Sequence, residues 1–168
     1  MDKDTFCTVY GQFFPPGGKH LSPNENELIS QATKDYAEMV FRTFDKQKTG
    51  ALEFENFVLN LSDLSRGSVE KKLEFIFALY DANEDGQISL EEIASVTRAV
   101  FGLVGPYSKR LKDDLPASIS ENINQKAASV LKKFDLDQDG VISRQEFFEV
   151  FQQDPELMKY LYFFDTYI

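Results

Sequence analysis

Apolar residues recur at helical spacing on both sides of three short polar segments. The segment 81–92 is flanked at spacings of three, four and seven by Leu73, Ile76, Phe77 and Tyr80 and by Ile93, Val96, Val100 and Leu103. The segment 135–146 is flanked in the same way by Ala127, Val130, Leu131 and Phe134 and by Phe147, Phe148, Val150 and Phe151. The third segment, 45–56, follows Val40, Phe41 and Phe44. The pattern predicts helix–loop–helix units and an all-α fold.

The segments 81–92 and 135–146 place oxygen donors in the same order around a glycine at position 6. Ca²⁺ takes six to eight oxygen ligands, and a twelve-residue loop wraps it only by turning sharply at that glycine. We therefore predict two EF-hand calcium sites, with a backbone carbonyl at position 7 and a bidentate glutamate at position 12. The predicted ligands are Asp81, Asn83, Asp85, Gln87 and Glu92 in the first loop and Asp135, Asp137, Asp139, Val141 and Glu146 in the second. Position 9 would contribute directly or through water, from Ser89 and Ser143.

The segment 45–56 keeps the first aspartate and the glycine of the same pattern but loses other ligands. Asn56 stands at position 12, where an amide offers one neutral oxygen in place of a bidentate carboxylate. Gln47 and Thr49 remove two further charges at positions 3 and 5. We expect weak or no calcium binding here, with Mg²⁺ as the alternative occupant, since it accepts fewer protein ligands and retains waters.

Spacing along the chain predicts how the loops pair. Ile88 and Ile142, both at position 8, would join the loops 81–92 and 135–146 through a short two-stranded β bridge, across a linker rich in glycine and proline. The loop 45–56 needs a partner upstream, where residues 4–14 read as the exit helix of another EF-hand whose loop would be ending as the chain begins. We predict an N-terminal lobe at 1–66 and a C-terminal lobe at 67–168.

Composition narrows the range of functions. The net charge of −10 argues against nucleic-acid binding by simple electrostatics. The single cysteine, Cys7, excludes an intramolecular disulfide, and no apolar run approaches the roughly 20 residues of a spanning helix. We expect a cytoplasmic protein that reaches a membrane only through a partner. We also expect no enzyme activity, since metal ligation accounts for the acidic clusters and the one histidine, His20, lies in a Pro-Gly loop.

Aromatic content is high, with 16 phenylalanines, 7 tyrosines and no tryptophan. Core packing would account for most of them, but the pairs Phe13–Phe14 and Phe147–Phe148 and the aromatic run near the C-terminus exceed what a small lobe needs. We expect some of them to line a groove for an amphipathic helix of a partner. The stretch 155–168 would occupy that groove when the partner is absent.

The chain resembles the neuronal calcium sensors, and within them the branch of potassium-channel-interacting proteins. The stretches that carry the likeness are TFCTVYGQFFPPGG, FRTFDKQKTGALEFENFVLNLSDLSRGS, KKLEFIFALYDANEDGQISLEEI and FDLDQDGVISRQEFFEVFQQDPELMKYLYFFD. The form TGALEFEN of the third loop and the linker GPYSKRLKDDLP favour that branch. The segments 22–35 and 118–126 depart from the family pattern and would deform the N-terminal half of the groove.

This resemblance implies a calmodulin-like fold and a cytosolic auxiliary subunit of A-type voltage-gated potassium channels, assembled into an oligomeric channel complex. The partner segment would be the N-terminal helix of the channel. Two alternatives stay open: a calcium sensor for a kinase, a cyclase or another channel, and a simple calcium buffer. Buffers bind with dissociation constants of roughly 10⁻⁹ to 10⁻⁸ M and barely open, whereas sensors bind at about 10⁻⁷ to 10⁻⁵ M and expose a groove.

Overall fold

The computed structural model describes residues 1–11, 23–104 and 119–158. Within these ranges the chain is mostly helical, with two short strands, as the sequence predicts. In chain order the elements are α1 (Lys3–Gly11), α2 (Pro23–Phe44), α3 (Phe54–Arg66), α4 (Val69–Tyr80), β1 (Gln87–Ser89), α5 (Leu90–Val104), α7 (Ile119–Phe134), β2 (Val141–Ser143) and α8 (Arg144–Gln153).

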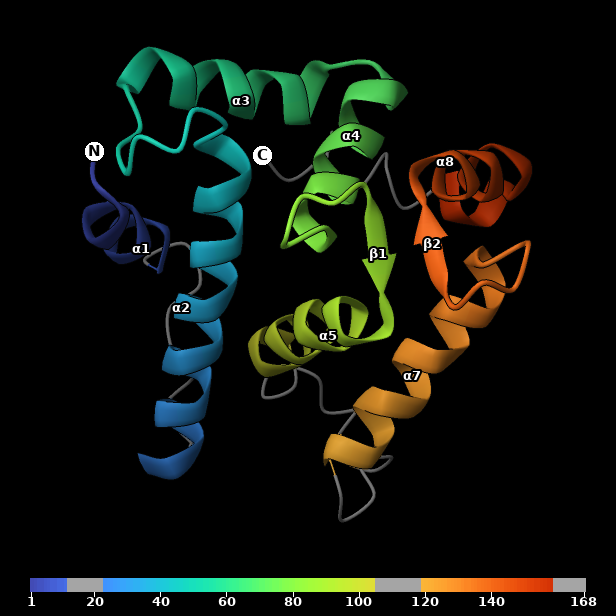
Figure 1. Cartoon of the computed structure of the whole chain (residues 1–168). Helices are drawn as coiled ribbons and strands as arrows, with labels where there is room; N and C mark the ends of the chain where they lie inside the picture. The colour runs from blue at the N-terminus through green and yellow to red at the C-terminus, as the bar shows by residue number, and fades with distance from the viewer. Residues whose placement is uncertain (12–22, 105–118, 159–168) are drawn as a thin grey trace.

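Figure 1 shows α1, α2 and α3 on one side of the molecule and α7, β2 and α8 on the other, with α4, β1 and α5 between them. The long helix α2 packs against α1, α4 and α5, and α5 also packs against α7. The middle helix–loop–helix unit, α4 to α5, therefore contacts both sides of the molecule.

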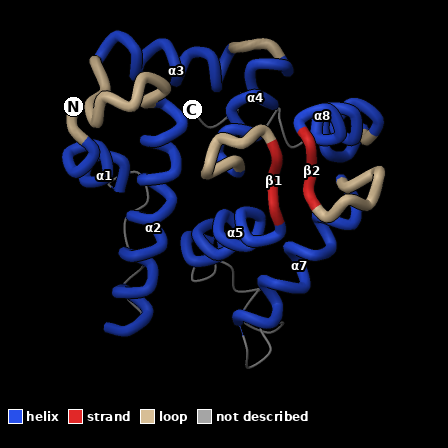
Figure 2. Tube along the Cα trace, viewed as in Figure 1, coloured by secondary structure: helices blue, strands red, loops and turns tan. Residues whose placement is uncertain are grey.

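The strands β1 and β2 form an antiparallel pair, drawn side by side in Figure 2. Ile88 faces Ile142 at the centre of the register, and both side chains are fully buried. The predicted bridge through position 8 of the two loops is confirmed. It fixes the loops back to back, so that the helices before and after each loop share one core.

That core, the C-terminal cluster, is built from α4, α5, α7, α8 and both strands. Phe147 lies at its centre, with its ring 5.5 Å from that of Phe77, 5.6 Å from that of Phe134 and 4.8 Å from that of Phe151. The pair Phe147–Phe148 was expected to exceed the needs of a small lobe, but α8 turns Phe147 inward, into this core. Its neighbour Phe148 is half-buried beneath the guanidinium of Arg144.

The second core, the N-terminal cluster, is dominated by aromatic rings. Phe6 of α1 is 1% exposed and contacts the rings of Tyr10, Phe41, Phe44 and Phe57. Aromatic pairs bury much apolar surface and add edge-to-face attraction. The high phenylalanine content of the chain is thus partly explained by this small core.

Residues 1 and 2 pair with the loop 45–56. Asp2 forms an antiparallel bridge with Ala51, and the backbones of Met1 and Leu52 exchange hydrogen bonds of 2.6 and 2.7 Å. In the β1–β2 pair, position 7 of one loop faces position 9 of the other. Ala51 stands at position 7 of its loop, so Asp2 occupies the place of a position 9. The loop 45–56 has the upstream partner that the sequence predicts.

The predicted lobe boundary between residues 66 and 67 falls between α3 and α4. Gly67 lies there because a Cβ at this residue would come within 2.1 Å of the carbonyl oxygen of Asp63. Packing crosses the boundary, since Phe75 and Leu79 of α4 belong to the N-terminal cluster while Leu73 belongs to the C-terminal one. The division into two lobes stays a prediction.

Other expectations meet the structure only in part. Most of the segment 22–35, expected to depart from the family pattern, is the beginning of α2. The described ranges do not include Phe13–Phe14, the linker residues 105–118 or residues 159–168. In the described part of the chain, no helix combines the length and apolar character needed to cross a membrane.

Candidate functional site

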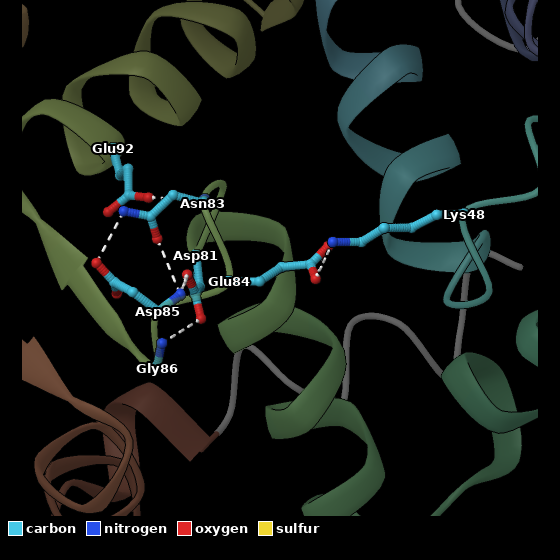
Figure 3. Close-up of polar contacts among 7 residues, drawn as sticks. All are labelled: Lys48, Asp81, Asn83, Glu84, Asp85, Gly86 and Glu92. Atoms are coloured by element: carbon cyan, nitrogen blue, oxygen red, sulfur yellow. Dashed lines mark hydrogen bonds and ion pairs between the residues drawn. The ribbon is translucent and has the colours of Figure 1, made fainter.

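The loop 81–92 follows directly from the end of α4 and leads into β1. Asp81 accepts hydrogen bonds from the backbone amides of Asp85 (3.1 Å) and Gly86 (3.0 Å), which fold the loop around its carboxylate (Figure 3). Gly86 has a φ of 83°, a conformation that favours glycine. Asp85 in turn accepts from the amide of Gln87 at 2.9 Å. The side chains at positions 1 and 5 are thereby brought to the same side of the loop.

Glu92, in the first turn of α5, closes this loop from the far end. One of its carboxylate oxygens accepts from the amides of Ala82 (2.9 Å) and Asn83 (3.3 Å). The other accepts from the amide and the hydroxyl of Ser89, at 2.9 and 2.8 Å. The predicted position-12 carboxylate therefore lies over the loop, and both of its oxygens are aligned by neutral donors.

The loop 135–146 repeats this arrangement. Asp135 accepts from the amides of Asp139 (3.1 Å) and Gly140 (3.0 Å). Glu146 accepts from the amides of Leu136 and Asp137 at the start of the loop, at 2.7 and 3.2 Å. Carboxylate oxygens of the three predicted aspartate ligands lie within 4.8 Å of one another, a group formed by Asp135, Asp137 and Asp139.

The serines at position 9 have a role that the sequence analysis did not assign. Ser143 caps α8 by accepting from the amide of Glu146, while Glu146 accepts from the amide of Ser143, which is a complete capping box. The hydroxyls of Ser89 and Ser143 donate to the carboxylates of Glu92 and Glu146. Position 9 thus holds the position-12 glutamate in place.

The electrostatics of the loop 135–146 suit a cation. Burial opposes the charged form of Glu146, but hydrogen bonds from Ser143, Asp137 and Leu136 outweigh it and lower the pKa of this carboxyl. Four carboxylates in one loop repel one another unless a cation lies between them. The side-chain donors are all oxygens, without histidine or cysteine, a set that fits Ca²⁺ and Mg²⁺ better than softer transition metals.

The predicted ligand sets of the two loops differ in charge. In the loop 81–92, position 3 is Asn83, whose side-chain amide donates to Asp85 at 2.8 Å. In the loop 135–146, position 3 is Asp137, a third aspartate. The predicted ligands therefore include three carboxylates in the loop 81–92 and four in the loop 135–146.

The loop 45–56 has the same beginning and a different end. Asp45 accepts from the amides of Thr49 (3.0 Å) and Gly50 (2.7 Å), and these hydrogen bonds lower its pKa against the opposing effect of burial. Asn56, at position 12, is exposed, and no hydrogen bond from it to this loop occurs among the described residues. The loop is therefore folded around its first aspartate but is not closed from the far end.

Comparison with known proteins agrees with this geometry. A family model described as an EF-hand domain pair matches residues 34–98 and again residues 70–152. The chain is 30% identical to human recoverin over 164 residues, which is 97% of this chain and 72% of recoverin. The chain belongs to the EF-hand family, in its neuronal calcium sensor group.

The two matches of this EF-hand protein overlap at the middle helix–loop–helix unit. The loop 81–92 is the second loop of one match and the first loop of the other, as expected for a unit that packs against both sides. EF-hand pairs bind Ca²⁺, so calcium binding is the chemistry of this site. The Mg²⁺ site in the loop 45–56 and the potassium-channel branch stay predictions.

Two features near the site escaped the sequence analysis. Lys48 of the loop 45–56 forms an ion pair of 2.6 Å with Glu84 of the loop 81–92 (Figure 3). Apolar side chains of α3 are exposed to solvent, namely Phe54, Val58 and Leu59. The spacing of Phe54 and Val58 in the sequence is helical, but sequence alone does not tell an exposed apolar face from a buried one.

Proposed function

We propose that this EF-hand protein is an intracellular calcium sensor that binds two Ca²⁺. It would regulate a membrane partner by binding an amphipathic helix of that partner. The most concrete candidate for that helix is the N-terminal segment of an A-type voltage-gated potassium channel. The observation that carries the proposal is the pair of bridged loops, each closed by a glutamate of its exit helix. The absence of enzyme activity and the cytoplasmic location stay expectations.

In these loops, Asp81, Asp85 and Glu92 would hold one Ca²⁺, together with Asn83 and the carbonyl of Gln87. The second ion would be held by the aspartates at 135, 137 and 139, by Glu146 and by the carbonyl of Val141. A bound Ca²⁺ screens the mutual repulsion of these carboxylates. Because each glutamate lies in the first turn of an exit helix, ligation there would act directly on the orientation of α5 and α8.

The exposed face of α3 supports a protein partner. Phe54 is 81% exposed, Leu59 56% and Val58 44%, so three large apolar side chains are in contact with water on one helix. Exposed apolar patches mark interaction sites, and helix-in-groove binding uses such surfaces. The net charge of −10 favours a helix that carries basic residues. The choice of an A-type channel segment rests on the resemblance of the sequence to the potassium-channel-interacting proteins.

Calorimetry tests the proposal. The protein is titrated with Ca²⁺, and then with a peptide copying the channel's N-terminal helix, in calcium and in chelator. The control peptide has its apolar face replaced by serine and glutamine. We expect two calcium sites and tight binding of the native peptide alone. The double variant Phe54→Gln, Leu59→Gln should weaken peptide binding at any salt concentration, whereas Glu55→Gln on the same helix should have only the small, salt-dependent effect of one exposed charge.

Each outcome separates one part of the proposal from the rest. No calcium binding would refute the sensor itself. Two calcium sites without peptide binding would leave a buffer or a sensor for another target. If the α3 double variant binds the peptide as tightly as the parent does, α3 is not the docking face, although the proposed partner still stands.

A further inference from the structure

The loop 45–56 contacts the loop 81–92 although the two loops do not form a bridge with each other. The ammonium group of Lys48 lies 2.6 Å from a carboxylate oxygen of Glu84. Figure 3 shows the two side chains extended toward each other from opposite sides of the gap between these loops. The loop expected to be weak in calcium binding is thereby joined to one of the two expected to bind it.

Equivalent positions make this contact. Lys48 and Glu84 both stand at position 4 of their loops, and both have left-handed backbone conformations, with φ of 54° and 60°. The corresponding residue of the loop 135–146 is Gln138, with a φ of 63°. Position 4 supplies no ligand in the EF-hand pattern, so the side chain of Glu84 is available to a neighbour.

Another contact joins the N-terminal half of the protein to the start of the loop 81–92. Arg42 of α2 donates to the carbonyl of Leu79 at 2.8 Å, two residues before Asp81. The side chain of Leu79 is buried in the N-terminal cluster. The beginning of the loop 81–92 is therefore positioned by the N-terminal half of the protein, which also supplies Lys48 to the ion pair.

The charge of Lys48 opposes calcium at this loop. Glu84 adds a negative charge beside the ligands of Ca²⁺, and the ammonium group of Lys48 neutralises it. A Ca²⁺ ion in the loop would attract Glu84 and repel Lys48. The bound ion and the ion pair are therefore antagonists, and each lowers the stability of the other by the same factor.

We propose that Lys48 of the loop 45–56 sets the calcium affinity of the loop 81–92, by an ion pair with Glu84 that calcium binding loosens. The inference rests on the proposed calcium site at 81–92 and gives the degenerate loop a regulatory role there. Loss of calcium strengthens this contact between the two halves of the protein, and calcium weakens it.

The two calcium loops can be followed separately by nuclear magnetic resonance. The amides of Gly86 and Gly140 each donate to the first aspartate of their own loop, so each amide signal reports one site. We would titrate the full chain with Ca²⁺ in a chelator buffer at low salt. Lys48→Gln should raise the calcium affinity reported by Gly86 about two- to fourfold, the range for one exposed ion pair, and leave that reported by Gly140 unchanged.

Lys34→Gln, an exposed lysine of α2, is the control for net charge. In a Glu84→Gln background, Lys48→Gln should have no more effect than Lys34→Gln, because the partner that holds Lys48 near the loop is gone. High salt should abolish the difference between Lys48→Gln and the parent.

An unchanged or lowered affinity at Gly86 would overturn the proposal, since a lower affinity would mean that the ion pair prepares the loop for calcium. An equal change at both glycines, or a full effect in the Glu84→Gln background, would also overturn it. If Gly86 of the parent does not respond to calcium, the site itself fails, a result distinct from a responding site that is insensitive to Lys48.

Discussion

The loop 45–56 and the two predicted calcium loops begin alike and end differently. In all three, the aspartate at position 1 accepts from the amides of positions 5 and 6, and position 4 and the glycine at position 6 have positive φ. Only Glu92 and Glu146 reach back to the amides of positions 2 and 3. Asn56 has no such contact among the described residues.

The comparison separates folding of the loop from metal binding. The turn requires an aspartate to collect backbone amides and a glycine to reverse the chain, and the loop 45–56 retains both. A closed set of ligands also requires the carboxylate at position 12. Instead, the degenerate loop is held by residues 1 and 2 and by an aromatic core.

A substitution in the N-terminal aromatic core should change the free energy of unfolding more than any other change proposed for this protein. Phe6→Ala should destabilise the protein by about 3–5 kcal/mol, because the ring is fully buried among four other aromatic rings. The loss should be the same with and without calcium, since Phe6 contacts neither calcium loop. Urea unfolding followed by circular dichroism measures it. Val9→Ala, at a more exposed site on α1, is the control; equal losses in the two variants would contradict the aromatic core as the support of this half.

Position 12 carries the next largest effect. Glu146→Gln should weaken calcium binding at its loop on the order of 100-fold, because a bidentate charged ligand becomes a neutral one. Glu92→Gln should do the same at its own loop. Calorimetry should count one tight site in each variant. Glu91→Gln, at the exposed residue next to Glu92, is the matched control. Two tight sites remaining in Glu146→Gln would refute the ligand assignment.

Restoring a glutamate at position 12 should give the loop 45–56 some calcium binding, a smaller effect than the loss at the other two loops. Asn56→Glu restores the carboxylate at position 12 in a loop that already has the calcium-loop fold. We expect a third site in calorimetry, weaker than the other two because positions 3 and 5 stay neutral. Adding Gln47→Asp and Thr49→Asp should strengthen it. Calcium stoichiometry that stays at its original value in the triple variant would show that position 12 is not what separates the loops.

The smallest effect concerns the end of the C-terminal half. A hydrogen bond from Lys133, at 2.6 Å, and the amides of Leu157 and Glu156 lower the pKa of Asp154. A lowered pKa contributes stability above the unfolded value, and this contribution is lost as pH falls through the folded value. Asp154→Asn should therefore lower the Tm slightly at neutral pH and not below the folded pKa. A difference in Tm that persists at the lowest pH would contradict the ionic origin.

Much of this molecule could be predicted from the sequence because the information is local. The ligand order, the glycine at position 6 and the flanking apolar spacing lie within a few residues of one another, and they predict the helices, the loops and the β bridge. The buried Ile88 and Ile142 were found because position 8 has a fixed role in the pattern. In contrast, the pair Phe147–Phe148 was expected to exceed the needs of a small core, because an aromatic pair does not reveal which ring faces inward; Phe147 is in fact buried.

The calcium-loop pattern, the missing carboxylate at Asn56 and the need for an upstream partner of the loop 45–56 can all be recognised in the amino-acid sequence. Three other features depend on how the helices pack: the contribution of α4 to both cores, the exposure of Phe54 and the contact between Lys48 and Glu84. They involve residues that are far apart in the chain. Lys48 and Glu84 belong to loops that do not bridge each other, so their contact depends on how α2 and α4 pack, and no local spacing encodes it.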